Sequence, residues 1–501
     1  MRDLKFLIGN QAVYDSLQKK DTKTFYKTEK NLYLGNEQLN NVEMKGATST
    51  KDGAKGLVPR PKKTDAHKFL RGDGTWGELS FQETLYWKKL NGDNDNSGNN
   101  SKELKLFGLI IEDESNPADA ITYIEDNQNF VSAFMDYDND IFNFGDWTVQ
   151  NGAWFMDSKP CVLNYNGTVE YYLDPDNWAK KIDGSDSNIY DENIPGNVMI
   201  EIPKIYWKVI NDIAAKTTTI YFANQKVDDD FVCWSHIDNN GNELDYCYVS
   251  AYEGSLIDGK IRSLSGKTPC ASLTVKQESD YIAANNEGST AIWTKGVLTD
   301  RVLIDLLLLL IGKSTETQGI FGKGNVNGGQ DTIKVTGTMD DKGLFYGSQD
   351  GSSGVKVFGI EHYWGNLWKR IAGWINDNDI QKVKMTHGIS DGSDTEGYNL
   401  DGSGYIEIIN SNSEEVNEGY ISKCLYSTIG VIPIEANGSS STYYGDTLTF
   451  GAGGTNYAIV GGCVDSDNAA GAFCTDINHT PYTAYWYVTT MISCKSLLNN
   501  K

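Results

Sequence analysis

The stretch Val355–Asn376, VKVFGIEHYWGNLWKRIAGWIN, decides how the rest of this chain is interpreted. Three of its tryptophans fall within eleven consecutive positions. Aromatic side chains bury the largest apolar area per residue, so indoles this close together predict the densest part of a core. The Gly-Asn pair between them tolerates a left-handed backbone, which lets the chain reverse beneath the rings. We interpret the stretch as a structural keystone and not as an active site. The keystone residues are Trp364, Gly365, Asn366, Trp368 and Trp374.

Within this stretch, Gly365-Asn366-Leu367-Trp368 resembles the Gly-Asn-Val-Trp-Glu-Trp signature of the C-type-lectin-like fold in its formylglycine-generating-enzyme variety. Lys369 and Arg370 stand where the signature has Glu-Trp. The family includes sulfatase-modifying enzymes and also many bacteriophage fibre and receptor-binding domains. The rest of the chain must therefore decide which branch this resemblance implies.

Composition restricts the class of protein. A chain of 501 residues is long enough for two or three domains. Its 51 glycines, with many Tyr, Thr, Ser and Asn residues, indicate a β-rich and turn-rich architecture. The formal charge of −24 argues against binding to nucleic acid, since a phosphate backbone requires a cationic surface.

No segment is typical of a leader or a membrane span. The first residues lack the cationic and apolar regions of a signal peptide. The longest apolar run, Val302–Ile311, is interrupted by Asp305 and has about half the length that spans a bilayer. We therefore expect a buried helix here and no membrane insertion. A helix over Thr299–Lys313 is predicted, with Thr299 or Asp300 as its N-cap and Gly312 as its stop.

Cysteine and acidic patterns give weak signals for metal. The chain has no CxxC pair, so the spacing of a zinc site is absent. In a bacterial cytoplasm such cysteines usually stay reduced and buried. The DxDxDG spacing of a calcium loop is also missing. Clusters of acidic residues such as DSD and DND leave open whether the chain binds a structural calcium ion. We expect no cofactor. The cysteines are Cys161, Cys233, Cys247, Cys270, Cys424, Cys463, Cys474 and Cys494.

The first 101 residues divide into two modules. In residues 1–45, Thr24–Lys27 and Asn31–Gly35 alternate in polarity around a short polar turn, which predicts a β-hairpin. Residues 46–101 form a Gly/Pro-rich connector followed by a polar linker. Gly-Leu-Val-Pro and Lys-Phe-Leu-Arg-Gly-Asp-Gly-Thr-Trp in this connector resemble the connectors of phage tail and head fibres. Its few apolar residues suffice for a core only if several chains wrap around one axis.

Residues 102–501 change to closely spaced aromatic strands. Asn240-Gly241 and Asp258-Gly259 are hairpin-turn dipeptides within them. The order of the blocks "VMIEIPK", "YVSAYEGS" and "RSLSG", followed by the leucine-rich helix, resembles the lectin-like heads of phage fibres. The expected fold class is mainly β with short helices (α+β). It comprises an N-terminal hairpin, an extended intertwined connector and a large C-type-lectin-like domain.

No catalytic residue is predicted. The sulfatase-modifying branch works through a late cysteine pair, but Cys463 and Cys474 lie in sequences typical of framework strands. No Gly-x-Ser-x-Gly elbow is present, and the five histidines are scattered. We expect His362 to be a packed or hydrogen-bonded ring. Chance pairs among 68 acidic residues do not single out a glycoside-hydrolase site.

The C-terminal third predicts a binding surface, because it combines rigid aromatic faces with short amide and carboxylate groups on loops. About half of its aromatic residues are expected in the core, Tyr457 and Trp486 first. The candidate ligand-binding residues are Tyr443, Tyr444, Asn456, Tyr457, Asp465, Asp467, Asn468, Asp476, Asn478, His479, Tyr482 and Tyr485.

The resemblances together imply a bacteriophage virion fibre, made in the bacterial host cytoplasm and carried on the extracellular particle. We expect a homotrimer that attaches to capsid or tail proteins through its N-terminus and binds a glycan or protein of the bacterial surface. Attachment to the head or to the tail stays open. A purely structural capsid decoration and a capsule-degrading depolymerase fibre are the alternatives.

Overall fold

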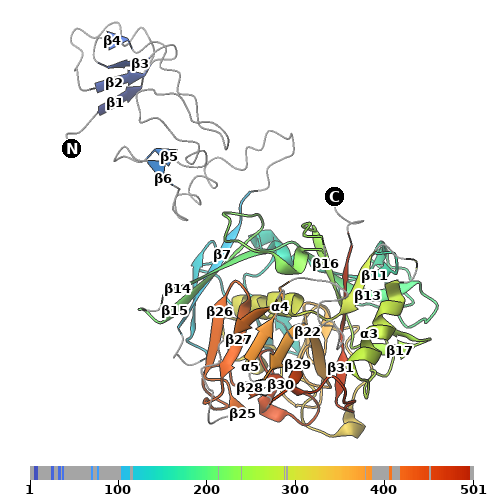
Figure 1. Cartoon of the computed structure of the whole chain (residues 1–501). Coiled ribbons are helices and arrows are strands. Elements are labelled where there is room, and N and C mark those ends of the chain that lie inside the picture. The colour runs from blue at the N-terminus through green and yellow to red at the C-terminus, as the bar shows by residue number, and fades with distance from the viewer. Residues whose placement is uncertain are drawn as a thin grey trace. The chain divides into compact units, whose positions relative to one another are not determined.

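The computed structural model divides the chain into two compact units, Met1–Ser101 and Lys102–Lys501 (Figure 1). In the first unit it describes six short strands. In the second it describes residues 103–496 apart from 113–116, 213, 239, 287, 289–290, 379, 386–404, 409–417 and 451–452. The predicted connector, residues 46–101, lies outside the described residues except for two of these strands.

The first unit contains a small sheet with the order β1 (Lys5–Ile8), β2 (Thr24–Lys27), β3 (Leu32–Leu34) and β4 (Glu37–Gln38). Strands β2 and β3 pair antiparallel, as the alternation around residues 28–30 predicted. Strand β1 pairs with β2 in parallel, a partner that the alternation did not indicate. Two further strands, β5 (Phe69–Leu70) and β6 (Trp76–Gly77), pair antiparallel with each other.

The second unit is mainly β, with short helices, as predicted. Its described residues form three large sheets. The four-stranded sheet contains β14 (Tyr206–Asp212), β15 (Thr217–Ala223), β7 (Leu106–Glu112) and β8 (Ile121–Glu125). The six-stranded sheet contains β12 (Val169–Tyr172), β11 (Lys159–Asn164), β13 (Gly196–Pro203), β16 (Tyr246–Ser250), β32 (Ile492–Lys495) and β19 (Ile292–Lys295). The eight-stranded sheet contains β24 (Ile406–Ile408), β23 (Ile380–Val383), β22 (Trp368–Asp377), β29 (Thr455–Val460), β30 (Thr475–His479), β28 (Thr447–Phe450) and β25 (Glu418–Tyr420), with β31 (Val488–Thr490) paired to β22.

Four hairpins and several short helices complete the described part of this unit. The hairpins are β9 (Phe134–Asp136) with β10 (Ile141–Asn143), β17 (Ser255–Ile257) with β18 (Lys260–Arg262), β20 (Lys356–Val357) with β21 (Ile360–Glu361), and β26 (Lys423–Ser427) with β27 (Gly430–Glu435). The helices are α3 (Val275–Ala283), α4 (Leu298–Gly312) and α5 (Thr317–Phe321), and the 3-10 turns are η2 (Val149–Asn151), η3 (Trp154–Asp157), η4 (Trp234–His236), η5 (Ala284–Asn286), η6 (Gln330–Thr332) and η7 (Asp467–Ala469).

The C-terminal strands close the fold, because β32 inserts between β16 and β19 and pairs antiparallel with both. Figure 1 shows these red strands running beside the green strands of the six-stranded sheet. Residues more than 240 positions apart therefore share one sheet. The turn at Asp258 and Gly259 has φ values of 49° and 75°, the left-handed geometry that a tight hairpin requires.

Helix α4 lies at the centre of the second unit, and all of its residues are buried, as its apolar sequence predicted (Figure 1). Its predicted N-cap was wrong, whereas the helix ends at Gly312 as predicted. Val297 is the N-cap and makes no side-chain cap bond, while Asp300 lies in the first turn. Lys313 takes the left-handed position after the helix, with φ of 53°. Gly312 is needed for another reason, since a Cβ there would lie 2.9 Å from the Phe321 ring.

Candidate functional site

The turn at Gly365 and Asn366 is buried, and its polar groups are engaged within the protein. The two residues have φ values of 73° and 61°. The amide oxygen of Asn366 accepts from Asn325 Nδ2 at 2.9 Å and from the Lys334 backbone N–H at 2.8 Å. Its amide nitrogen donates to the Glu253 carboxylate. The pair is therefore a structural joint between loops that are distant in sequence.

The two residues that depart from the signature, Lys369 and Arg370, are buried cations. Lys369 Nζ lies 3.2 Å from Glu253 Oε1. Arg370 Nε lies 3.1 Å from Glu278 Oε2, which Lys295 Nζ approaches to 2.6 Å. Burial lowers the pKa of Lys369 to about 8 and raises the pKa of Glu253. Since a buried charge needs a partner, these cations serve the core.

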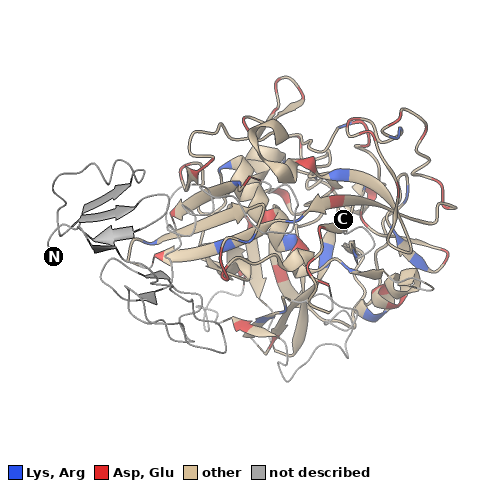
Figure 2. Cartoon of the chain, turned by 90° about the horizontal axis from the view of Figure 1, so that it is seen from above, with Lys and Arg blue, Asp and Glu red and all other residues tan. Residues whose placement is uncertain are grey.

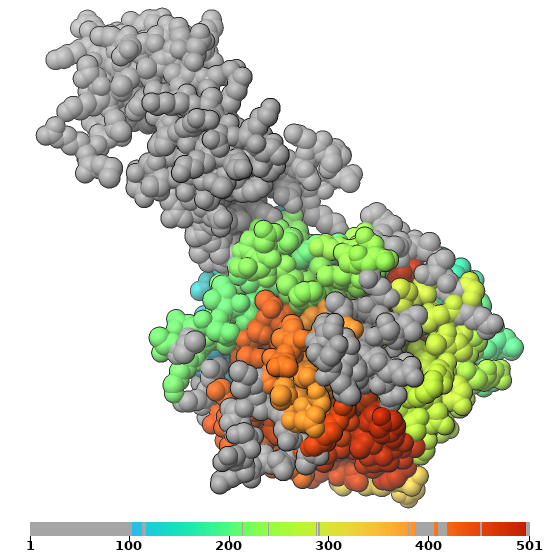
Figure 3. Space-filling model, in the orientation of Figure 1, coloured from blue at the N-terminus to red at the C-terminus, as the bar shows by residue number. Residues whose placement is uncertain are grey.

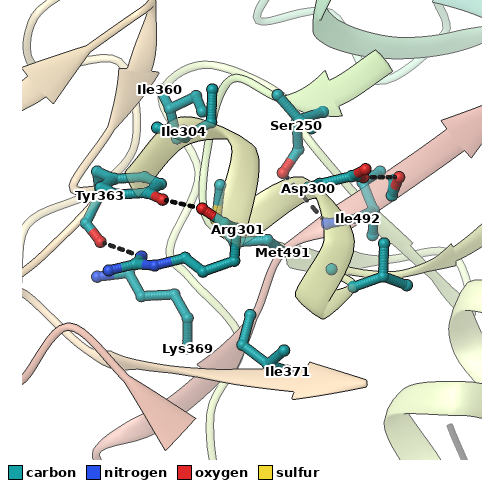
Figure 4. Close-up of a pocket in the computed structure, with 14 residues that line it drawn as sticks. Ser250, Asp300, Arg301, Ile304, Ile360, Tyr363, Lys369, Ile371, Met491 and Ile492 are labelled. Carbon is teal, nitrogen blue, oxygen red and sulfur yellow. Dashed lines mark hydrogen bonds between the residues drawn. The ribbon is translucent and has the colours of Figure 1, made fainter. Parts of the chain in front are cut away.

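A small cavity lies beside α4, and Figure 4 shows the side chains that surround it. Its volume is about 50 Å³, enough for a water molecule but far below the roughly 300 Å³ of a ligand pocket. Asp300 is bound to Lys495 at 2.6 Å, and Arg301 to Asp305 at 3.2 Å. The Arg301 guanidinium also lies 3.8 Å from the centre of the Tyr363 ring. The remaining cation that lines the cavity is Lys369, which pairs with Glu253. This cavity is part of the scaffold.

A second buried cluster consists of Lys356, Glu361 and His362, and their pKa values are strongly shifted. Burial raises the pKa of Glu361 to about 7 and lowers that of Lys356 to about 8. Burial also lowers the pKa of His362 to about 3. Such shifts are typical of active sites, but these side chains are at most 1% exposed. The His362 ring is packed, and neither ring nitrogen has a hydrogen-bond partner in the described part of the chain.

The structure separates the predicted binding residues into three groups. Burial removes Tyr444, Asn456 and Tyr457 from any surface that contacts a ligand, because β29 and the loop before β28 turn them into the core. The exposed residues are Asp465, Asp467, Asn468, Asn478 and Tyr482. The residues of intermediate exposure are Tyr443, Asp476, Tyr485 and Trp486. The expectation that Trp486 lies in the core was therefore wrong. His479 is buried, with 8% of its surface exposed.

Several of these residues meet around His479. Its Nδ1 lies 3.2 Å from the Asp476 carboxylate, and its Nε2 lies 3.2 Å from the Tyr487 hydroxyl. The Tyr485 ring lies 4.7 Å from the imidazole and 5.3 Å from the Tyr487 ring. The ring of Trp486 lies 5.4 Å from that of Tyr487. We call these five residues the His479 cluster, and they come from β30 and the loop before β31.

The His479 cluster belongs to the C-terminal part of the surface, the red region of Figure 3. The rings of Tyr485, Trp486 and Tyr487 are of intermediate exposure, while Asn478 and Tyr482, which are close to the cluster in the sequence, are exposed. Tyr487 was missed by sequence reasoning, although it continues the Tyr485-Trp486 run. Aromatic faces beside a carboxylate and an imidazole can bind a polar ligand with ring faces and hydrogen bonds.

Tyr443 belongs to a different surface. It lines a cleft of about 810 Å³ between the β14–β15 hairpin and the β26–β27 hairpin. Asn211, Thr218, Ser422 and Lys423 supply polar lining on these hairpins. None of the His479 cluster lines this cleft. The predicted set of residues therefore does not form one site.

Sequence reasoning also missed an aromatic groove of about 700 Å³. Phe142 and Phe345 stack at its base, with ring centres 4.5 Å apart. Ile141, Phe144 and Val149 line it and are 61%, 39% and 45% exposed. The sequence signal was the run of apolar residues separated by Asp and Asn between residues 130 and 149, which was interpreted only as part of the closely spaced aromatic strands.

All eight cysteines are free thiols, and seven are buried. Cys463 follows β29 and Cys474 precedes β30, as framework positions would. Burial raises the pKa of Cys463 to about 12 and raises that of Cys474 further. A thiol must lose its proton to act as a nucleophile, so this environment disfavours the cysteine chemistry of the sulfatase-modifying branch.

Two further findings concern metals and membranes. Among the described residues, no group of three or more His, Cys, Asp or Glu side chains is arranged to hold a metal ion. Within the same residues, no helix has the length and apolarity that crossing a membrane requires. Asp and Glu residues, red in Figure 2, fall on many loops of the second unit.

Two comparisons of the sequence with known proteins found no match. No protein-family model matches the chain. No curated protein matches its sequence. The function must therefore be argued from the residues themselves.

Proposed function

We propose that this chain is a structural component of a bacteriophage virion, a head or tail fibre whose residues 102–501 form a lectin-like head that binds a host-surface glycan. In this proposal the strands of residues 1–45 attach the fibre to capsid or tail proteins. Residues 46–101 connect them to the head, and three copies form the fibre. The virion is the site of action.

Two kinds of evidence support this proposal. The connector motifs and the order of sequence blocks in the head resemble those of phage fibres, and the fold is mainly β. The observation that carries the binding role is the His479 cluster, where the rings of Tyr485 and Tyr487, both of intermediate exposure, contact His479, which pairs with Asp476 at the end of β30. Sugar rings pack on aromatic faces while their hydroxyls bind carboxylates and imidazoles, so a glycan fits this surface.

A binding role agrees better with the titratable groups than catalysis does. The most strongly perturbed carboxylates, such as Glu361 and Asp305, owe their raised pKa to burial and contact other core residues. A general acid must reach the bond that it protonates. Asp476 of the His479 cluster is partly exposed and Asp465, whose charge acts on Tyr487, is exposed, so both carboxylates are suited to hydrogen bonding with a ligand.

The test is binding of the full chain to intact cells of candidate host bacteria, with released sugar assayed in parallel. We expect saturable binding and no release of oligosaccharide. Tyr482→Ala, which removes a side chain that is 75% exposed beside the cluster, should weaken binding at least fivefold. Tyr190→Ala is the matched control, because Tyr190 is 63% exposed and lies in another loop.

Other outcomes would overturn the proposal. Release of oligosaccharide would identify a depolymerase fibre. Failure to bind any host that the phage infects would favour a structural decoration. Equal loss of binding in Tyr482→Ala and Tyr190→Ala would place the glycan site elsewhere on the head.

A further inference from the structure

The aromatic groove combines a rigid base with exposed apolar walls. Phe345 stacks on Phe142 and also contacts Phe358 of the keystone stretch at 4.8 Å, so the base is anchored in the core. Phe144 packs edge-on against both phenyl rings of the base, at 5.0 and 5.8 Å. Yet Phe144 and the neighbouring Ile141 remain largely exposed. Apolar side chains gathered around a concavity mark a binding surface, whereas single exposed ones do not.

The rim of this groove is acidic. Asp140, Asp176 and Asp341 line it together with one cation, Lys342. Lys342 is already engaged, because its Nζ lies 3.1 Å from the Asp140 carboxylate and 4.4 Å from the centre of the Tyr346 ring. Within the described residues, Asp176 and Asp341 form no ion pair with a lysine or arginine, and both are exposed. Two carboxylates at the edge of an apolar groove favour a ligand that is both apolar and cationic.

The local charge agrees with the charge of the whole unit. Residues 1–101 contain 17 Lys or Arg and 13 Asp or Glu, so −28 of the formal charge belongs to residues 102–501. Acidic loops around the groove would attract a cationic segment before contact. The apolar lining then distinguishes the groove from the rest of the acidic surface.

The groove also borders an exposed strand edge. Strands β9 and β10 form a sheet with no third strand among the residues that the structure describes. β9 lies next to α5, where the Tyr137 hydroxyl directly after it donates to the Gly319 carbonyl, and β10 is the more exposed strand of the pair. β10 supplies Ile141 and Phe142 to the groove. An outer strand of this kind offers backbone N–H and C=O groups to an added strand.

We propose that this groove binds an extended segment of a partner polypeptide in which lysine or arginine alternates with large aliphatic residues. The segment pairs with the outer edge of β10. Its aliphatic side chains pack on Phe144 and Ile141, and its cations meet Asp176 and Asp341. The lining of Phe, Ile, Val and Met side chains favours such a segment over a glycan, whose hydroxyl groups would lose hydrogen bonds to water there.

The probe is the blocked hexapeptide acetyl-KLKLKL-amide, titrated into the full chain and followed by calorimetry. Acetyl-KSKSKS-amide keeps the charges and removes the apolar side chains. A KLKLKL peptide with N-methyl groups on alternate residues removes the donors that strand pairing needs. We expect each changed peptide to bind at least tenfold more weakly, a loss of about 1.4 kcal/mol or more.

Matched protein variants locate the site. Ile141→Arg should weaken binding of KLKLKL at least tenfold, while Leu256→Arg, at an exposed position on the β17–β18 hairpin, should leave it unchanged. Asp176→Asn with Asp341→Asn should weaken binding at least fivefold. The control pair Asp229→Asn with Asp280→Asn makes the same change of net charge away from the groove. Circular dichroism checks that each variant is folded.

Three results would overturn the proposal. Equal binding of KLKLKL and KSKSKS would mean adsorption to an acidic surface. Equal effects of the groove variants and their controls would place the peptide elsewhere. Binding of a neutral oligosaccharide that is lost in Ile141→Arg, without binding of KLKLKL, would assign the groove to a glycan. The proposed role of the His479 cluster is tested separately, because none of these variants touches it.

Discussion

Replacing Glu278 by glutamine should destabilise the second unit more than replacing either cation that it binds. Glu278 is 1% exposed and lies in α3. Its Oε2 accepts from Lys295 Nζ of β19 at 2.6 Å and faces Arg370 Nε of β22 at 3.1 Å. The triad thus connects one helix with the six-stranded and eight-stranded sheets. It holds two cations and a single carboxylate.

The size of the effect follows from these distances. At an effective dielectric constant of about 20, the two attractions are worth about 6 and about 5 kcal/mol. Repulsion between the cations and the desolvation of all three groups offset much of this. Removing one partner of a buried pair typically costs about 3–5 kcal/mol, because it leaves an uncompensated charge. We expect Glu278→Gln to lower the free energy of unfolding by about 4 kcal/mol.

Lys295→Met is the informative control. It removes one cation and leaves the Glu278–Arg370 ion pair, which has no net charge. Methionine also preserves most of the packing of the lysine side chain. We expect a cost of about 1 kcal/mol. The assay is urea unfolding followed by tryptophan fluorescence, with refolding checked and with the denaturant slope compared among proteins. A larger loss in Lys295→Met than in Glu278→Gln would refute the argument from charge balance.

Two further predictions concern acid and the keystone turn. Burial lowers the pKa of His236 and His362 to about 3, so both are neutral in the folded protein. Keeping these two rings neutral costs nothing above the unfolded pKa of about 6.5. As the pH falls from there toward 3, the free energy of unfolding decreases by up to about 1.4 kcal/mol per pH unit for each histidine. Unfolding measured from pH 7 to 5 should show this slope, and His236→Gln with His362→Asn should flatten it; an unchanged slope would contradict the assignment. Gly365→Ala should cost about 2–3 kcal/mol in urea unfolding, because φ is 73° and the new Cβ would lie 2.9 Å from the Asn325 carbonyl oxygen. Gly241→Ala, with φ of 81° and no atom within 4 Å, isolates the backbone strain and should cost about 1 kcal/mol; equal losses would remove the steric argument.

Local signals in the sequence predicted local structure well. Apolarity over residues 302–311 predicted a buried helix, and α4 is buried along its whole length. The Asp258-Gly259 dipeptide predicted a hairpin turn, and both residues have positive φ. These signals depend on neighbours within a few positions. The predicted N-cap was wrong, since Asp300 lies in the first turn and is bound by Lys495, a partner that no local pattern indicates.

The candidate site was harder to predict, because exposure depends on long-range packing. Tyr457 is buried, as expected, but its neighbour across β29 and β30, His479, is buried too, although it lies in a polar sequence. The aromatic groove shows the opposite error, since its base combines Phe142 with Phe345 from segments 203 residues apart. Its apolar residues resembled those of any strand. Only their joint exposure around a concavity distinguishes them.

The departures from the lectin-like signature have a physical explanation in the partners of Lys369 and Arg370. Glu253 and Glu278 lie 116 and 92 positions before them. Without its carboxylate, a cation at either position would be uncompensated in the core. The cation and the carboxylate of each pair therefore stabilise the core only when both are present. The Glu-Trp of the signature would place a carboxylate at position 369, beside Glu253, and like charges there would repel at close range in the core. Lys369 and Arg370 can therefore be replaced by Glu and Trp without loss of stability only if Glu253 and Glu278 change with them.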